Sequence, residues 1–309
     1  MGSTHANAEP RSGTNREFIV GLGRAFAGAL IFSLPLLMTM EMWALGFYVH
    51  PLRLALLLVL LIPLLIGLSY LGGLRRNAHI IDDVADALLA IAVAFCAALF
   101  VLWIFGLIGP GMSKREIVGK LALQIVPGSI GAMLAQNQLG GNAEWDKREA
   151  RQSYAGEIFV MMVGALFLIL NVAPTEEMAV IAFKMTVFKD VGLAVLSIAL
   201  MHVVVYVVEF HGTEQRHPAE SFFSVFARFT VVGYAAVFLV SFYILWTFGR
   251  LEGLSLEQVL SICVVLSFPG AIGAARAADS VMARKPKRSA KVQRGRLPGS
   301  GLSRLSAER

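Results

Sequence analysis

Hydrophobic and polar residues alternate along this chain in long blocks. Runs of about 20 apolar residues can cross, as helices, a hydrocarbon layer about 30 Å thick. Because a backbone in lipid must satisfy its own hydrogen bonds, each such run is expected to be a helix. The eight runs are 25–45, 53–73, 87–109, 117–136, 158–183, 190–208, 222–249 and 256–277. The predicted fold class is an all-α membrane protein with eight transmembrane helices.

The composition agrees with a chain that lies mostly in lipid. Of 309 residues, 57% are hydrophobic and 16% are charged, and the mean hydropathy is +0.69. Soluble domains carry about 25% charged residues. The lipid bilayer is therefore the first predicted partner.

The basic residues predict the orientation. An even number of spans places both termini on one side. Lysine and arginine in the loops are almost evenly divided between the two sides, and the basic residues of the termini decide the orientation. Basic segments are usually cytoplasmic, so the chain is predicted to be a multi-pass inner-membrane protein with cytoplasmic N- and C-termini. Residues 1–15 and the basic tail 281–309 are expected to be disordered. The tail's charge suits anionic lipid, and nucleic acid is not expected as a partner.

Three segments of the first half return in the second, in the same order. They are GALIFSLPLLMTMEMW (28–43) with GALFLILNVAPTEEMA (164–179), LWIFG (102–106) with LWTFG (245–249), and PGSIGA (127–132) with PGAIGA (269–274). We predict two parallel four-helix repeats, 16–136 and 153–280, joined by a cytoplasmic linker, 137–152. Four spans per repeat would relate them by a pseudo-two-fold axis along the membrane normal.

One helix start also occurs twice. Ser113-x-x-Glu116 and Ser255-x-x-Gln258 both have the spacing of a capping box. In this motif the serine accepts from a backbone amide, and the acid or amide side chain reaches back to the serine amide.

Two carboxylates occupy matched positions in the repeated segments, Glu41 and Glu177. A charge inside a membrane costs between about 3 and 17 kcal/mol, so these acids are expected to face the bundle interior. The sharper hypothesis is that they face each other and bind a cation or carry protons. The alternative is that they reach the outer interface and pair with Lys184 or Arg53. Glu176 is a weaker candidate of the same kind.

Proline–glycine pairs interrupt the fourth and eighth runs, at Pro127-Gly128 and Pro269-Gly270. Interrupted spans at corresponding positions are a pointer to a transport pathway. We therefore expect helix breaks that line the path. The alternative is a structural kink whose glycines allow close helix packing.

Three further polar residues lie in or beside apolar runs. His202 sits near the middle of the sixth run and is a candidate proton relay, although a packed, hydrogen-bonded histidine explains it as well. Asp86 and Arg228 occupy similar positions in the two halves and are expected to form a structural pair.

The duplicated TMEM and PTEEM helices and the segment DDVADALLA (82–90) resemble an uncharacterised family of bacterial integral membrane proteins. The resemblance covers about residues 16–280 and implies the architecture, without a substrate or a catalytic residue.

The pattern favours a channel or secondary transporter for a small cation or proton. The alternatives are a non-transporting membrane scaffold or sensor, and an intramembrane enzyme that acts on lipid. No phosphate-binding loop or metal-ligand motif occurs, so no catalytic residue and no cofactor are predicted. The sequence leaves open the identity of any metal and whether the chain forms a homo-oligomer.

Overall fold

The computed structural model describes residues 12–72, 80–139, 154–212 and 226–282. Every regular element in these ranges is a helix, and eight of the helices are long and apolar enough to cross a membrane. The predicted all-α fold with eight spans is therefore confirmed. The linker 137–152 and the two terminal segments, 1–15 and 281–309, lie mostly outside the described residues.

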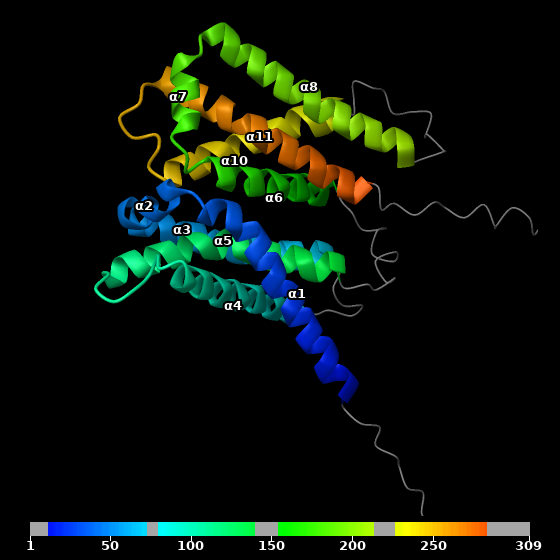
Figure 1. The fold of residues 1–309 in the computed structure, drawn as a ribbon. Coiled ribbons are helices and arrows are strands. Elements are labelled where there is room, and N and C mark those ends of the chain that lie inside the picture. The colour runs from blue at the N-terminus through cyan, green and yellow to red at the C-terminus, as the bar shows by residue number, and fades with distance from the viewer. Residues whose placement is uncertain (1–11, 73–79, 140–153, 213–225, 283–309) are drawn as a thin grey trace, which may run out of the picture.

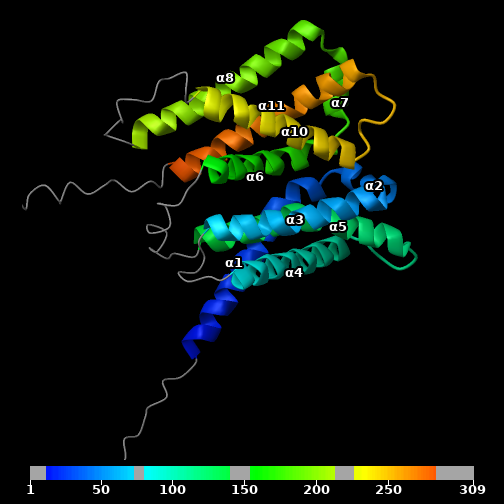
Figure 2. The ribbon, with the colours of Figure 1, turned by 180° about the vertical axis from the view of Figure 1, so that it is seen from behind.

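The helices form two halves that lie side by side (Figures 1 and 2). The short helices α2 and α7 lie at the same end of the bundle, which also holds the loops after α4 and α10. In chain order the helices are α1 (Ser12–Leu37), α2 (Met40–Tyr48), α3 (Pro51–Gly72), α4 (Ile80–Ile104), α5 (Lys114–Leu139), α6 (Tyr154–Val172), α7 (Glu177–Lys184), α8 (Val187–Gly212), the π-helical turn η3 (Phe226–Val231), α10 (Val232–Thr247) and α11 (Leu256–Met282).

The first and fifth spans are not continuous helices, as 25–45 and 158–183 were predicted to be. The first is divided into α1 and α2, and the fifth into α6 and α7. The residues between the helices are Met38 and Thr39 at the first break and residues 173–176, which include a proline, at the second. Apolar residues flank both breaks, so hydropathy averaged over the span does not reveal them.

Matched threonines explain both breaks. Thr39 Oγ1 donates to the carbonyl of Leu36 at 2.9 Å, and Thr175 Oγ1 donates to that of Val172 at 2.8 Å. The Trp43 indole also donates to a carbonyl at the end of α1, at 2.7 Å. These side chains satisfy carbonyls that a helix end leaves without partners. The repeated threonine of the TMEM and PTEEM segments is thus a helix-ending residue in both halves.

One central helix organises each half: α1 packs along α5, and α6 packs along α11. The central helices are α5 and α11. Their spans are the two most buried of the eight, with 78% of the residues buried in the most apolar part of Lys114–Gln136 and 61% in that of Leu256–Ala278. Glycine permits both crossings, since a Cβ at Gly28 would collide with the carbonyl of Gly131, and one at Gly164 with that of Gly273.

The proline–glycine pairs do not break their helices, contrary to the expectation for Pro127-Gly128 and Pro269-Gly270. Both prolines lie inside continuous helices, α5 and α11. A Cβ at Gly128 would lie 3.1 Å from that of Ala94, and one at Gly270 would lie 2.7 Å from Val237. These contacts agree with the alternative explanation, close packing, and the role of the four residues in lining a path stays a prediction. A proline removes only one helical donor, which a packed membrane helix tolerates.

The repeated Leu-Trp-x-Phe-Gly segments end α4 and α10 in the same way. Gly106 has φ +69° and Gly249 has φ +72°, a conformation that favours glycine. The following residues, Leu107 and Arg250, donate backbone bonds of 2.9 Å to carbonyls five residues back. This is the Schellman pattern of helix ends.

The predicted two-fold arrangement of the halves is not confirmed. Helix α3 contacts α6 and α10 of the other half, and a two-fold axis would place α8 equally close to the first half. Instead α8 packs on α11 and lies at the edge farthest from the first half (Figures 1 and 2). The internal duplication itself stays a prediction.

Candidate functional site

The first turns of α5 carry three polar residues at a spacing of four: Glu116, Lys120 and Gln124. Residues four apart lie on one face of a helix, and we call these three the α5 polar face. Ser113 starts the helix, because its Oγ accepts from the Glu116 amide at 3.2 Å. The polar face therefore begins at the membrane end that holds α2 and α7 and runs inward.

A buried ion pair lies at the centre of this face. Lys120 Nζ and Glu116 Oε1 are 2.7 Å apart, and their side chains are only 6% and 7% exposed. Nζ also donates to the carbonyl of Leu107 at 3.0 Å and lies 5.4 Å from the centre of the Phe47 ring. The pair thus joins α5 to the loop after α4 and to α2.

A close contact between helices encloses the pair. Helix α2 lies directly against α5, since a Cβ at Gly46 would be 2.8 Å from Lys120 Cγ. A Cβ at Gly119 would in turn collide with the Gly46 carbonyl. Larger residues at these glycines would push α2 away and admit lipid or water to the pair.

The matched site of the second half has no such pair. When the two halves are aligned with an offset of 142 residues, from Ser113 to Ser255, Gln258 corresponds to Glu116 and Ile262 corresponds to Lys120. Ser255 and Gln258 form the predicted reciprocal capping box, with bonds of 2.9 and 3.3 Å. The predicted box at Ser113 is only half formed, because Glu116 turns to Lys120 instead.

The pair is chemically suited to hold a proton at either of two places. Lys120 lies six residues into its span, about 9 Å at 1.5 Å per residue. Two desolvated charges strongly prefer to remain paired. Transfer of a proton from Nζ to Oε1 across the 2.7 Å bond turns the ion pair into a neutral amine and carboxylic acid. An ionisable pair at such depth is a candidate for a proton or ion pathway.

The structure does not bring Glu41 and Glu177 together. Each lies in the first turn of a short helix, α2 or α7, and no hydrogen bond or ion pair joins either acid to another described residue. Glu41 is half-buried and Glu177 is exposed. A carboxylate in the first turn is favoured by the helix dipole. Their cation or proton role stays a prediction.

The other predicted residues lie in separate places. Glu176 is exposed and lies 3.9 Å from Arg250. His202 Nδ1 is 3.0 Å from Thr230 Oγ1, so it is hydrogen-bonded between α8 and η3. Asp86 is half-buried in α4, while the side chain of Arg228 lies outside the described part of the structure, and their pairing stays a prediction.

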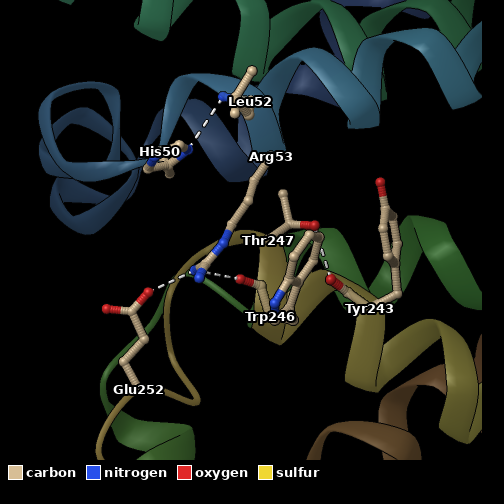
Figure 3. Close-up of polar contacts among 7 residues, drawn as sticks. All are labelled: His50, Leu52, Arg53, Tyr243, Trp246, Thr247 and Glu252. Carbon is tan, nitrogen blue, oxygen red and sulfur yellow. Dashed lines mark hydrogen bonds and ion pairs between the residues drawn. The ribbon is translucent and has the colours of Figure 1, made fainter.

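Two arginines make contacts at the loop after α10, at the same end of the bundle: Arg53 binds the loop from outside it, and Arg250 belongs to it. Arg53 reaches from α3 to the end of α10 (Figure 3). It donates to the Trp246 carbonyl at 3.0 Å, pairs with Glu252 at 2.7 Å, and lies 4.8 Å from the Trp246 ring centre. From this loop, Arg250 donates to the carbonyl of Pro174. We call the contacts of Arg53 the inter-half clamp.

The clamp also corrects a sequence expectation. Arg53 was considered as a partner for the acids Glu41 and Glu177, but its carboxylate partner is Glu252 of the other half. Thr247 and His50 make only local bonds beside it, to the Tyr243 carbonyl and the Leu52 amide (Figure 3). The clamp therefore holds the two halves together at one level of the bundle.

Sequence reasoning missed Lys120 as a site residue. The sequence did contain a signal, namely a lysine within an apolar span, which is rare because burying its charge in the membrane is energetically unfavourable. Comparison of the repeats directed attention to positions that match, and Lys120 is matched by Ile262. A comparison that looks only for shared residues therefore passes over Lys120, which the second half lacks.

A family model described as "Putative integral membrane protein (DUF2391)" matches residues 21–278. Neither a curated protein nor a solved structure matches the chain.

Proposed function

The chain belongs to this family of integral membrane proteins, and from that premise we propose that it is a proton-conducting channel or a proton-coupled secondary transporter. Glu116 and Lys120 are the proposed proton-carrying pair. The observation that supports the proposal is the 2.7 Å contact between two ionisable side chains that are each more than nine-tenths buried within a span.

The proposed path begins at the end of the bundle that holds α2. Glu116 lies in the first turn of α5 and Lys120 one turn deeper. Glu41 is on α2, which packs against this part of α5, and in the proposal its carboxylate attracts cations to the entrance. Glu177 has the same position on α7 but no ion pair beneath it, so its contribution is proposed to be smaller.

We further propose the inner membrane as the location, with both termini cytoplasmic. The charge distribution of the sequence supports this orientation. It would place the α2/α7 end outside and the proton-carrying pair in the outer leaflet. Binding of anionic lipid by the tail 281–309 belongs to the same proposal and concerns residues outside the described ranges.

The second candidate is a non-transporting scaffold or sensor, and the inter-half clamp favours it. A hydrogen bond, an ion pair and a cation–π contact centre on Arg53 and would hold the halves in one arrangement. The two functions differ in one measurable quantity, the movement of protons.

The test uses the purified full-length chain in liposomes that contain a pH-sensitive dye. A membrane potential is imposed, and proton entry is compared between the wild type and Lys120→Met. Loss of a group that carries the proton is expected to slow entry on the order of 100-fold. Lys114→Met is the matched control, because Lys114 starts the same helix but is exposed. It should retain the wild-type rate.

A second variant guards against misfolding. The double change Glu116→Gln plus Lys120→Gln removes both charges and keeps two polar groups at hydrogen-bonding distance. It should fold and still fail to conduct. Folded Lys120→Met protein that conducts like the wild type would refute the assigned residues, and a folded wild type that moves no protons would favour the scaffold.

A further inference from the structure

The third member of the α5 polar face, Gln124, has an unexplained oxygen. Its side chain is only 2% exposed, and its Oε1 has no hydrogen-bond partner among the described residues. A buried carbonyl oxygen without a donor is unfavourable, and such groups in native proteins usually bind an ordered water. Packing does not require glutamine here, because the matched residue of α11 is Leu266, which is also fully buried.

Lys120, one turn earlier, has a third N–H without an oxygen acceptor among the described residues, and the centre of the Phe47 ring lies 5.4 Å from its Nζ. An ammonium group has three N–H bonds. One is directed to Glu116 Oε1 at 2.7 Å and one to the Leu107 carbonyl at 3.0 Å. The four-residue spacing places Gln124 on the same face of α5, as the contact between Glu116 and Lys120 demonstrates for the preceding turn.

We infer that the α5 polar face binds a water molecule between Lys120 Nζ and Gln124 Oε1. The water accepts the third N–H of Lys120 and donates to Oε1, so it has the two polar partners that a buried water needs. The second half cannot bind such a water in the same way, because Ile262 and Leu266 replace both partners.

The water extends the proposed proton path toward the middle of the membrane; this role, but not the binding itself, rests on the proposed function. Lys120 gives a proton to Glu116, which leaves a neutral amine and a neutral acid. A hydronium ion at the water site then gives one proton to the amine and becomes water. Glu116 releases its proton at the α2 end. One proton has crossed this segment, and every group has returned to its starting form.

The test compares thermal unfolding and proton entry for Gln124→Leu, in detergent and in liposomes respectively. If the water is bound, leucine removes one of its two partners and leaves the third Lys120 donor unsatisfied. The melting temperature should then fall by about 2–4 °C. If Oε1 is simply without a partner, leucine removes that penalty and the melting temperature should rise, which would overturn the inference.

Two variants act as controls. Gln136→Leu makes the same change on the same helix at a half-buried position away from this face, and it should leave both readings unchanged. Gln124→Asn keeps a neutral acceptor oxygen on this face and should restore part of the melting temperature and proton entry that Gln124→Leu loses. Failure of this rescue would also count against the water site.

The two readings separate the inference from the proposed function. A lower melting temperature for Gln124→Leu, together with a wild type that moves no protons, would keep the water site and refute transport. A higher melting temperature, together with a conducting wild type, would keep transport and refute the water site. If both hold, Gln124→Leu should also slow proton entry at least about tenfold.

Discussion

The crossing of α1 and α5 at Gly28 allows a prediction with a control on the same helix. In Gly28→Ala the new Cβ would lie 3.0 Å from the carbonyl carbon of Gly131, and closer still to that carbonyl oxygen and to the Ala135 Cβ. Gly23 lies five residues earlier on α1, and a Cβ there would meet nothing within 4 Å. The same substitution therefore tests packing at one site and helix propensity at the other.

The expected magnitude follows from two opposing terms. Overpacking a well-packed contact costs about 1–3 kcal/mol, and the upper end applies because the obstacle is backbone rather than the end of a flexible side chain. Replacing glycine by alanine within a helix contributes about 1 kcal/mol in the other direction. Gly28→Ala should thus lower the free energy of unfolding by about 2 kcal/mol, whereas Gly23→Ala should raise it by up to about 1 kcal/mol.

The assay is unfolding of the purified protein from mixed micelles by added denaturing detergent, followed by the fluorescence of its four tryptophans. Gly164→Ala should behave like Gly28→Ala, because its Cβ would collide with the Gly273 carbonyl. Equal or greater stability of Gly28→Ala relative to Gly23→Ala would show that α1 and α5 do not approach closely, and the description of the helix core would be incorrect.

Three further predictions concern the clamp, a helix end and the ion pair, all measured by the same unfolding assay. Arg53→Ala should lower the free energy of unfolding by about 1–2 kcal/mol, the sum of an exposed ion pair and a cation–π contact. The control Arg115→Ala should leave it almost unchanged, because Arg115 is exposed and has no ion pair among the described residues. Equal effects of the two changes would mean that the clamp does not hold the halves. Gly249→Ala should cost about 1–2 kcal/mol, because alanine is strained at φ +72°, and a neutral result would contradict the helix end. Lys120→Met alone should lower the free energy of unfolding by about 3–5 kcal/mol, because it leaves Glu116 buried and unpaired. Adding Glu116→Leu should recover most of this loss. Additive losses from the two changes would show that the charges are not coupled.

Much of the fold follows from properties that act within one segment of the chain. Apolar runs specify the eight spans, because an apolar segment of that length forms a helix that can cross the lipid. Local chemistry also explains the repeated motifs: threonine ends α1 and α6, and glycine ends α4 and α10. The break in the first span was missed because threonine is compatible with both a helix interior and a helix end. The break in the fifth span did carry a local signal, Pro174, which lies two residues after the end of α6.

The arrangement of the halves depends on contacts between distant residues and could not be predicted. A matching order of helices suggested a two-fold axis, but α3 and α8 have different neighbours. The partner of Arg53 is 199 residues away, in a loop whose sequence gives no indication of the contact. Hydropathy carries no information on which apolar faces meet each other and which meet lipid.

The candidate site was only partly accessible from the sequence for a related reason. Matched acids drew attention to Glu41 and Glu177, which the structure places in the first turns of two separate short helices. Glu116 was interpreted as a capping residue, although Lys120 one turn later offered a stronger partner. A search for charges inside spans, made independently of the repeats, would have found this pair.

The most direct test of the central claim is the rate of proton entry into liposomes containing the Glu116→Gln plus Lys120→Gln protein, measured against the wild type at equal amounts of folded protein. If the buried pair carries the proton, the wild type conducts and the double variant is slower on the order of 100-fold. Equal rates in the two proteins would contradict the claim and show that protons, if they cross at all, do so elsewhere.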